Sequence, residues 1–329
     1  TELGLFNNRI RLEGDFYDSQ SIDLLLNVPV PTITGYSTQM QNIGKVQNRG
    51  MEFTLNTKNL TGEFAWSSNF NISFNKNKVL EVGVDGRPIY GSAANANNAF
   101  ITKPGYPIAS FYGYKYIGVF QSEEELAKYP HLSGDKVGDG RYEDVNKDGV
   151  LDQNDKTILG DNNPLFTAGF SNSFSYKNFT LDIQFTGSYG AEVFSFYKRM
   201  CGIYHGDRNG MIEQLGRWQS KDQPGDGIHF RPTRTPSGWQ RDPSSAWVQD
   251  ASYLRLRNLT LGYNFDQKVL DKMKMKGLRL YVTGQNLFTI TNYVGYDPET
   301  SSESGLAQGG DYLGYPAARS FIIGANITF

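Results

Sequence analysis

Apolar and polar residues alternate with period two along much of the chain, which predicts β-strands whose two faces meet different surroundings. In residues 178–189 the odd positions from Phe179 to Tyr189 are mostly apolar and the even ones polar. In residues 63–75 the even positions from Phe64 to Phe74 are mostly apolar. We predict a partial strand ending at Leu5 and eight full strands at residues 9–24, 46–57, 63–75, 165–176, 178–189, 253–265, 278–290 and 318–329.

Three local signals add detail to this strand pattern. Between Leu256 and Leu259 the apolar phase slips by one residue, which predicts a β-bulge near Arg257 and Asn258. Asp266 is expected to cap a short helix in the following link, and Ser122 is expected to open a helix through a capping box with Glu125.

The links between the predicted strands alternate strictly between short and long. The short links follow Leu5, span residues 58–62, surround Lys177 and span residues 266–277; the long ones are about 25–45, 76–163, 190–250 and 291–317. All long links therefore fall on one side of the sheet. Short periplasmic turns, long extracellular loops, an apolar outside and a polar lumen are typical of antiparallel transmembrane β-barrels.

The alternative is a soluble β-sandwich whose polar face meets water. Loop asymmetry and the apolar strand faces favour the barrel.

Composition supports an all-β fold and narrows the function. The 329 residues include 36 glycines, 20 tyrosines and 21 phenylalanines, which favour strands and turns over helices. A formal charge of -2 does not imply a basic, nucleic-acid-binding surface. The single cysteine, Cys201, cannot form an internal disulfide, and no apolar run is long enough for a transmembrane helix. The chain has no leader at Thr1, so any signal peptide is expected further upstream or removed.

Residues 144–155 match the spacing of a calcium-binding loop of the EF-hand type. Glycine stands at position six and an aspartate replaces the usual glutamate at position twelve, which resembles the dockerin-type loop and favours weak, extracellular-style binding. We expect a structural Ca²⁺, with oxygen donors from Asp144, Asn146, Asp148, Val150 (its carbonyl), Asp152 and Asp155. The alternative is an acidic, solvated loop that folds through its own Asx turns without metal.

Short motifs in a specific order run through the whole chain. They are residues 4–9, 23–31, 42–50, 111–115, the calcium-like loop, 253–263, 284–288 and the closing Phe329. In this order they resemble the C-terminal part of a SusC/RagA-like TonB-dependent outer-membrane transporter. The closing strand, with apolar residues alternating from Phe321 to Phe329, is similar to the terminal β-signal that the outer-membrane assembly machinery recognises.

The resemblance implies that residues 1–329 form eight to nine strands of a 22-stranded, plugged barrel. A signal peptide, a plug domain and the earlier strands are expected outside this sequence. The resemblance also implies import of an oligosaccharide or oligopeptide, captured with a SusD/RagB-like surface lipoprotein that acts as a lid and energised by the TonB–ExbB–ExbD complex. The long loops would be extracellular and the C-terminus periplasmic, and a dimer of the transporter–lipoprotein complex stays open. No catalysis is required.

The resemblance implies that aromatic residues of the long loops are the candidates for ligand contact. These could stack on sugar rings or hold peptide side chains; loop aromatics also commonly pack against one another. The candidates are Trp218, Trp239, Trp247, Tyr293, Tyr296, Tyr312 and Tyr315.

Other polar residues of the loops suggest weaker hypotheses. One hypothesis is that an anion, such as a carboxylate or sulfate, binds Arg231, Arg234 and Arg241. The alternative is that these arginines form a solvated face of the loop. The spacing of His131, His205 and His229 does not match a zinc site. Two other functions stay open: a secreted, calcium-stabilised β-sandwich that binds glycans or acts as an adhesin, and a glycosidase. The glycosidase would need two carboxyl groups roughly 5 to 10 Å apart, drawn from Asp207, Asp222 and Asp226.

Overall fold

The structure is a computed structural model of the 329-residue chain. It describes residues 1–29, 33, 35–36, 38–82, 86–93, 96–202, 209–233, 242–300 and 305–329.

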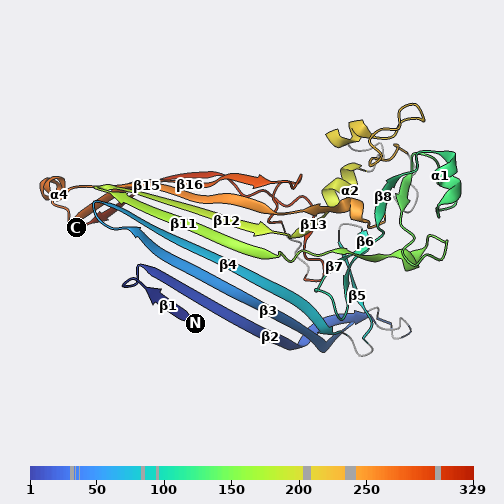
Figure 1. The fold of residues 1–329 in the computed structure, drawn as a ribbon, viewed down its shortest axis with the longest axis horizontal. Coiled ribbons are helices and arrows are strands. Elements are labelled where there is room, and N and C mark those ends of the chain that lie inside the picture. Colours follow the sequence, from blue (N-terminus) through green and yellow to red (C-terminus); the bar gives the residue numbers. More distant parts are fainter. Residues whose placement is uncertain are drawn as a thin grey trace.

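A long antiparallel sheet of nine strands forms the body of the molecule (Figure 1). Its strands, in spatial order, are β1 (Glu2–Leu5), β2 (Ile10–Pro29), β3 (Thr38–Leu60), β4 (Phe64–Glu81), β11 (Phe166–Tyr176), β12 (Phe179–Tyr189), β15 (Tyr253–Asn264), β16 (Gly277–Thr291) and β18 (Ser320–Thr328). Strands that are consecutive in this sheet are also consecutive among the predicted strands. The predicted partial strand and eight full strands are therefore confirmed.

The first long link is shorter than predicted. Pairing between β2 and β3 continues to Pro29 and Thr38, and β4 continues to Glu81. The assignment of residues 25–29, 38–45 and 76–81 to loops is thus wrong. Backbone ladder bonds hold these extensions.

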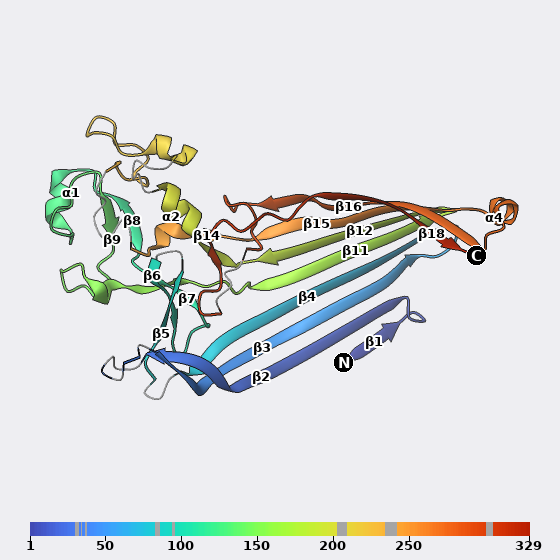
Figure 2. The same cartoon turned by 180° about the vertical axis from the view of Figure 1, so that it is seen from behind.

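All short links lie at one end of the sheet and the long ones at the other (Figures 1 and 2). The predicted short helix is α4 (Gln267–Met273), with Asp266 at its N-cap position. The predicted cap itself is wrong, because the Asp266 carboxylate makes no hydrogen bond to the helix backbone and instead accepts one from Asn178 Nδ2 at 2.8 Å. This bond ties the helix to the neighbouring β11–β12 turn.

The β-bulge is confirmed. The register of the pairing between β15 and β16 shifts between Leu256 and Asn258, and the register between β12 and β15 shifts between Gln184 and Phe185. The extra residue is Arg257, whose side chain joins the polar face of the sheet.

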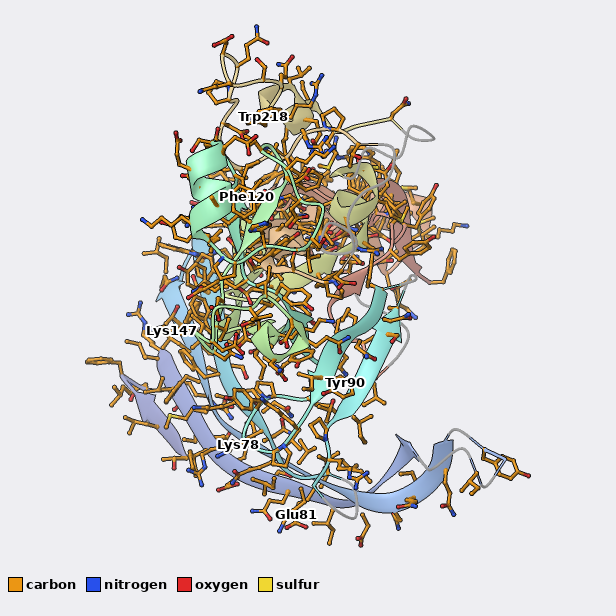
Figure 3. The ribbon with its side chains drawn as sticks, turned by 90° about the vertical axis from the view of Figure 1, so that its right-hand side faces the viewer. Lys78, Glu81, Tyr90, Phe120, Lys147 and Trp218 are labelled. Carbon is orange, nitrogen blue, oxygen red and sulfur yellow. The ribbon has the colours of Figure 1, made fainter. Side chains whose placement is uncertain are left out.

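The two faces of the sheet differ as the alternation predicts. Aromatic pairs such as Phe70 with Phe170 and Phe74 with Phe166 line the apolar face, and large side chains there remain exposed, with Phe16 62% accessible. The polar face is the concave one, and the long insertions fill this side at their end of the sheet (Figure 3). An apolar face of this extent is unusual in contact with water.

The long insertions fold into small sheets and helices. A four-stranded sheet has the order β10-β7-β6-β5, a three-stranded sheet has the order β14-β13-β17, and β8 pairs with β9. The elements are β5 (Ile89–Ala93), β6 (Ala96–Thr102), β7 (Ser110–Gly113), β8 (Tyr116–Val119), α1 (Glu123–Lys128), β9 (Gly140–Tyr142), η2 (Gln153–Asp155), β10 (Thr157–Gly160), β13 (Glu192–Ser195), α2 (Phe196–Gly202), η3 (Ile212–Gly216), η4 (Ser245–Trp247), β14 (Val248–Asp250) and β17 (Gly310–Asp311).

We call these elements together the loop assembly, and several of them, among them β6, β7, β13 and α2, pack around one apolar core. Phe100, Phe111, Phe194 and Phe196 are fully buried there and contact one another. Ser122 caps α1 as predicted, its hydroxyl accepting from Glu125 N, while the Glu125 carboxylate accepts from Gln121 N and not from Ser122 N. Among the described helices none is both long enough and apolar enough to span a membrane.

Candidate functional site: the concave face and the loop assembly

The concave face of the sheet is a wall of amides and hydroxyls that bond to one another across the strands. Asn69 donates to Asn56 at 2.6 Å, and Ser173 donates to Asp182 at 2.6 Å. Nearer the bulge, Asn258 donates to Gln184 at 2.7 Å. Such cross-strand bonds fix the side chains in place, so the wall offers a preorganised polar surface.

A buried arginine joins this wall to the loop assembly. The Arg255 side chain is only 3% accessible and contacts two carboxylates, that of Asp297 at 2.6 Å and that of Glu299. It also donates to Thr289 Oγ1 at 2.9 Å, and Arg257 donates to Glu299 at 2.5 Å. The segment around residues 297–299 is therefore held against the sheet by charge-assisted hydrogen bonds.

The Asp297 carboxyl is adapted to this position. Burial alone raises its pKa, but hydrogen bonds from Arg255 and from the backbone N–H groups of Glu299 and Ala317 outweigh burial and lower the pKa below the ordinary aspartate value. Asp297 is thus held ionised as the partner of Arg255.

Two of the candidate ligand-contacting aromatics are internal. Trp247 is 3% accessible and belongs to the apolar core of the loop assembly. Tyr293 is 5% accessible and donates its hydroxyl to the Asp311 carboxylate. Burial, and secondly this hydrogen bond, raise the pKa of Tyr293. We correct the prediction for both residues, because their side chains pack loops together and leave little surface for a ligand.

The other candidate aromatics differ in exposure. Tyr296, Tyr312 and Tyr315 are 67%, 58% and 97% accessible. Tyr296 stacks against Tyr197 of α2 with ring centroids 6.4 Å apart, and Tyr312 meets the edge of the buried Phe196. Trp218 is half-buried against the apolar core, and Trp239 lies outside the described residues.

Sequence reasoning missed Tyr197, Arg255, Asp297, Glu299 and Asp311. The two arginines of the β15 segment stand in its polar phase, which was the one available signal for Arg255. The others come from insertions without periodicity, and nothing local indicates which partners they meet.

Arg231 does not offer a free guanidinium. It lies 2.8 Å from Asp139 Oδ1 through Nε and donates to Asp139 Oδ2 through Nη2 at 3.0 Å, and Asp139 is almost fully buried. The prediction of anion binding is therefore wrong for Arg231, whose charge an internal carboxylate neutralises. Arg234 and Arg241 lie outside the described residues.

The remaining histidines and aspartates have local roles. His229 Nδ1 lies 2.6 Å from Asp226 Oδ2. Burial alone raises the pKa of Asp226, but hydrogen bonds from His229 and from backbone N–H groups lower it overall. The ring of His131 packs by its edge on Phe120. Asp222 is exposed, and His205 and Asp207 lie outside the described residues.

The calcium-like loop is closed by its own side chains. Asp144 accepts from the backbone of Lys147 at 2.7 Å and of Gly149 at 2.9 Å, and Asp148 accepts from Val150 N at 2.8 Å. Asn146 Oδ1 accepts from Asp148 N at 3.0 Å. The carboxylate of Asp155, which is fully buried, accepts from Val145 N and Asp152 N.

This geometry suits both interpretations of the loop. The donors are all oxygens and Gly149 has a positive φ of 85°, as a calcium loop requires. However, within the described ranges no three His, Cys, Asp or Glu side chains are gathered as metal ligands, and the Asx turns already close the loop. Calcium binding stays a prediction.

Comparison with known proteins finds sequence relatives among TonB-dependent receptors. No protein-family model matches the chain. TonB-dependent receptor P3 of Formosa agariphila is 36% identical over 340 residues, and TonB-dependent receptor SusC of Bacteroides thetaiotaomicron is 29% identical over 339 residues. Both matches include 100% of this chain but 33% and 31% of the relative. The chain therefore spans about a third of the length of these relatives.

A solved structure has the same fold. The RagAB peptide transporter superposes with a TM-score of 0.80 over 99% of this chain and 34% of that chain, at 23% sequence identity. A partial match of this kind agrees with the C-terminal barrel portion expected from the sequence motifs. Along its whole length, the chain is thus related to a part of the TonB-dependent receptors that include SusC, and it has the all-β fold of the RagAB transporter over that part.

Proposed function

We propose that the polypeptide containing this chain is an outer-membrane importer of a bulky nutrient, an oligosaccharide or an oligopeptide. The observation that carries the proposal is the nine-stranded sheet with an apolar convex face and a polar concave face, matched over its full length by TonB-dependent receptors. In a barrel the apolar face meets lipid and the polar face lines the lumen. This chain supplies part of the wall and a set of loops above it.

The proposal extends to partners and orientation. A surface lipoprotein of the SusD/RagB kind would cover the loops, and the TonB–ExbB–ExbD complex would supply energy through parts of the polypeptide outside this sequence. The loop assembly would be extracellular and Phe329 periplasmic. Among the predicted aromatics, the exposed Tyr296, Tyr312 and Tyr315 would be available to a ligand or to the lid.

The secreted β-sandwich is less well supported. A sandwich would cover the apolar face with a second sheet, and in the described part of the chain no strands lie against the face that carries Phe16, Phe74 and Phe170.

Deleting the parent gene is expected to abolish uptake of one ligand class by intact cells. The measurement compares fluorescently labelled oligopeptides and oligosaccharides of similar size, in the wild type, the deletion strain and a strain without TonB. Tyr296→Ala should lower uptake several-fold, with Tyr106→Ala, an exposed tyrosine elsewhere, as control. A polypeptide that fractionates as soluble, or whose mass is not roughly two to three times that of this chain, would contradict the proposal.

We also propose that Ca²⁺ binds residues 144–155 and holds this loop shape. Asp144, Asn146, Asp148, Asp152 and the Val150 carbonyl would supply oxygen ligands, with Asp155 at position twelve. A bound ion would neutralise the aspartates that the loop gathers and would stabilise the fold through the mass action of ligand binding.

Calcium at ten times its dissociation constant is expected to raise the free energy of unfolding by about 1.4 kcal/mol. Asp148→Ala should remove this gain, because it removes one of the proposed oxygen ligands. The substitution should cost little in the absence of calcium, because Asp148 is exposed and otherwise makes only local turn contacts. Glu124→Gln, an exposed acid on α1, is the control. The measurement is thermal unfolding of the full-length protein with Ca²⁺ or chelator. An unchanged melting temperature, or an equal gain in Asp148→Ala, would favour the metal-free Asx loop.

A further inference from the structure

The four-stranded sheet of the loop assembly has one buried face and one open face. Phe100 on β6 and Phe111 on β7 pair with each other in register, are fully buried and belong to the apolar core. By alternation the opposite face carries Tyr90 on β5 and Tyr112 on β7. Tyr90 is 43% accessible and Tyr112 is half-buried. Figure 3 shows Tyr90 within the curve of the main sheet, on its concave side.

The two tyrosines form one aromatic surface. Their ring centroids are 5.7 Å apart, with the ring planes inclined by 49°. Since β6 runs between β5 and β7, the rings meet across it, and Ile101, the β6 residue in register with Tyr90, is only 2% accessible. Burial raises the pKa of Tyr112, and the adjacent Tyr90 hydroxyl, to which Tyr112 is hydrogen-bonded, raises this pKa further. The Tyr112 phenol is therefore uncharged at neutral pH.

The strands that carry this surface contain no charged residue. The sequences of β5, β6, β7 and β10 are IYGSA, ANNAFIT, SFYG and TILG. The charged residues within two positions of these strands are Arg87, Lys103, Lys115, Asp155, Lys156 and Asp161. Within the four strands, the open face is thus made of neutral groups alone.

The lysines and acids that flank the strands contact other groups. Lys103 lies over the ring of Tyr106 and Lys156 over that of Tyr114, with Nζ 4.6 and 5.0 Å from the ring centroids. Lys115 pairs with Glu143 at 2.5 Å. The Asp155 carboxylate accepts from backbone N–H groups of its own loop, and Asp161 accepts from Asn163. These contacts engage the flanking charges outside the tyrosine pair.

The β5–β6 hairpin adds neutral hydrogen-bonding groups beside the rings. Ser92, Asn97 and Asn98 are exposed, and Ser92 Oγ accepts from Asn98 N at 2.9 Å. Side-chain amides both donate and accept hydrogen bonds, as does a hydroxyl. These groups match the hydroxyls of a sugar, which also donate and accept.

A neutral oligosaccharide fits this surface better than an oligopeptide does. One face of a sugar ring consists largely of C–H groups, which pack on an aromatic ring, and the hydroxyls at its edge reach neighbouring amides. An unblocked oligopeptide carries an ammonium group at one end and a carboxylate at the other. Desolvating either charge without an opposite charge is costly, and the four strands provide none.

We propose that the surface formed by Tyr90 and Tyr112, with Ser92, Asn97 and Asn98 at its edge, binds a neutral sugar unit of the imported ligand. The inference rests on the proposed import function and narrows its ligand to an uncharged oligosaccharide. It adds two tyrosines to the aromatic residues predicted from the sequence.

The test is isothermal titration calorimetry of the full-length polypeptide in mild detergent with three neutral hexasaccharides, maltohexaose, xylohexaose and mannohexaose, and with hexa-alanine. We expect a hexasaccharide to bind and Tyr90→Ala to weaken this binding on the order of tenfold, as for other contacting aromatics. Tyr90→Phe keeps the ring and should stay within about threefold of the wild type, since it loses at most one hydrogen bond.

Tyr106→Ala is the matched control. Tyr106 belongs to the same insertion and is also 43% accessible, but its ring lies under Lys103, so the substitution should leave saccharide binding unchanged. Melting temperatures of the variants separate lost contact from lost fold, and Tyr90→Leu replaces Tyr90→Ala if the latter unfolds.

Three outcomes would overturn the site. The first is that none of the hexasaccharides binds, whether or not hexa-alanine does. The second is saccharide binding that Tyr90→Ala leaves intact, and the third is an equal loss in Tyr106→Ala. If deletion of the parent gene abolishes uptake while any of these occurs, the importer stands and only the saccharide site fails.

Discussion

Arg255→Ala is expected to release the segment around residues 297–299 from the sheet and to destabilise its docking by about 3 kcal/mol. The substitution leaves the carboxylates of Asp297 and Glu299 in a partly dry site with only Arg257 to balance them. Removing one partner of a buried ion pair is costly because the other charge stays desolvated. The measurement is limited proteolysis of the full-length protein within residues 292–317, together with thermal unfolding.

The control is Arg11→Ala, which also breaks two contacts with carboxylates. Arg11 reaches Glu2 at 2.9 Å and Glu13 at 2.8 Å, but its side chain is 48% accessible. Exposed ion pairs contribute at most about 1 kcal/mol, so this variant should be cut at the wild-type rate. Similar behaviour of the two variants would show that burial of Arg255 does not matter.

Lowering the pH is a second test of the ion pair between Arg255 and Asp297. Because the pKa of Asp297 is lower when folded than when unfolded, its stabilising effect is complete above the ordinary aspartate pKa. It is lost as the pH falls through the lower folded-state value. Cleavage near Asp297 should therefore rise below about pH 4 in the wild type. Arg255→Ala should already be cut fast at neutral pH, with little further change in acid.

The sequence was sufficient for the strand pattern because each strand must satisfy two environments at once. Alternation from Phe64 to Phe74 and from Phe179 to Tyr189 records that requirement residue by residue, and even the bulge near Arg257 is visible as a slip in phase. The alternation no longer marks the strand where its two faces do not meet different environments. Beyond Phe16 on β2, both faces carry polar residues such as Asp18 and Ser19, so the true length of the strand is not marked.

The candidate site was harder to predict because exposure depends on distant partners. Tyr293 and Tyr296 are the same residue type three positions apart, yet one is buried on Asp311 and the other is exposed on Tyr197. Arg231 is neutralised by Asp139, which lies 92 positions away. Residue type identifies such groups as chemically capable, but only packing decides which of them meet solvent.

Phe194→Ala is expected to cost about 3–5 kcal/mol, the largest effect that we predict within the loop assembly. Phe194 is fully buried, with ring centroids 6.0 Å from Phe100, 6.1 Å from Phe111 and 5.1 Å from Phe196. It also stands in β13, the central strand of the small sheet with β14 and β17. Truncation leaves a cavity where segments from three insertions meet, and the surrounding rings cannot all close it.

The cost should be confined to the loop assembly, because the nine-stranded sheet has its own backbone ladder and Phe194 lies outside it. Hydrogen exchange of the full-length protein should show faster exchange in β5, β6, β7 and β13, with β11 and β12 unchanged. Tyr315→Ala, which removes a fully exposed aromatic ring of the same region, should alter neither. Faster exchange in β11 and β12 would mean that loops and sheet unfold as one unit. Confinement to the loops would mean instead that the loop assembly unfolds as a unit separate from the nine-stranded sheet.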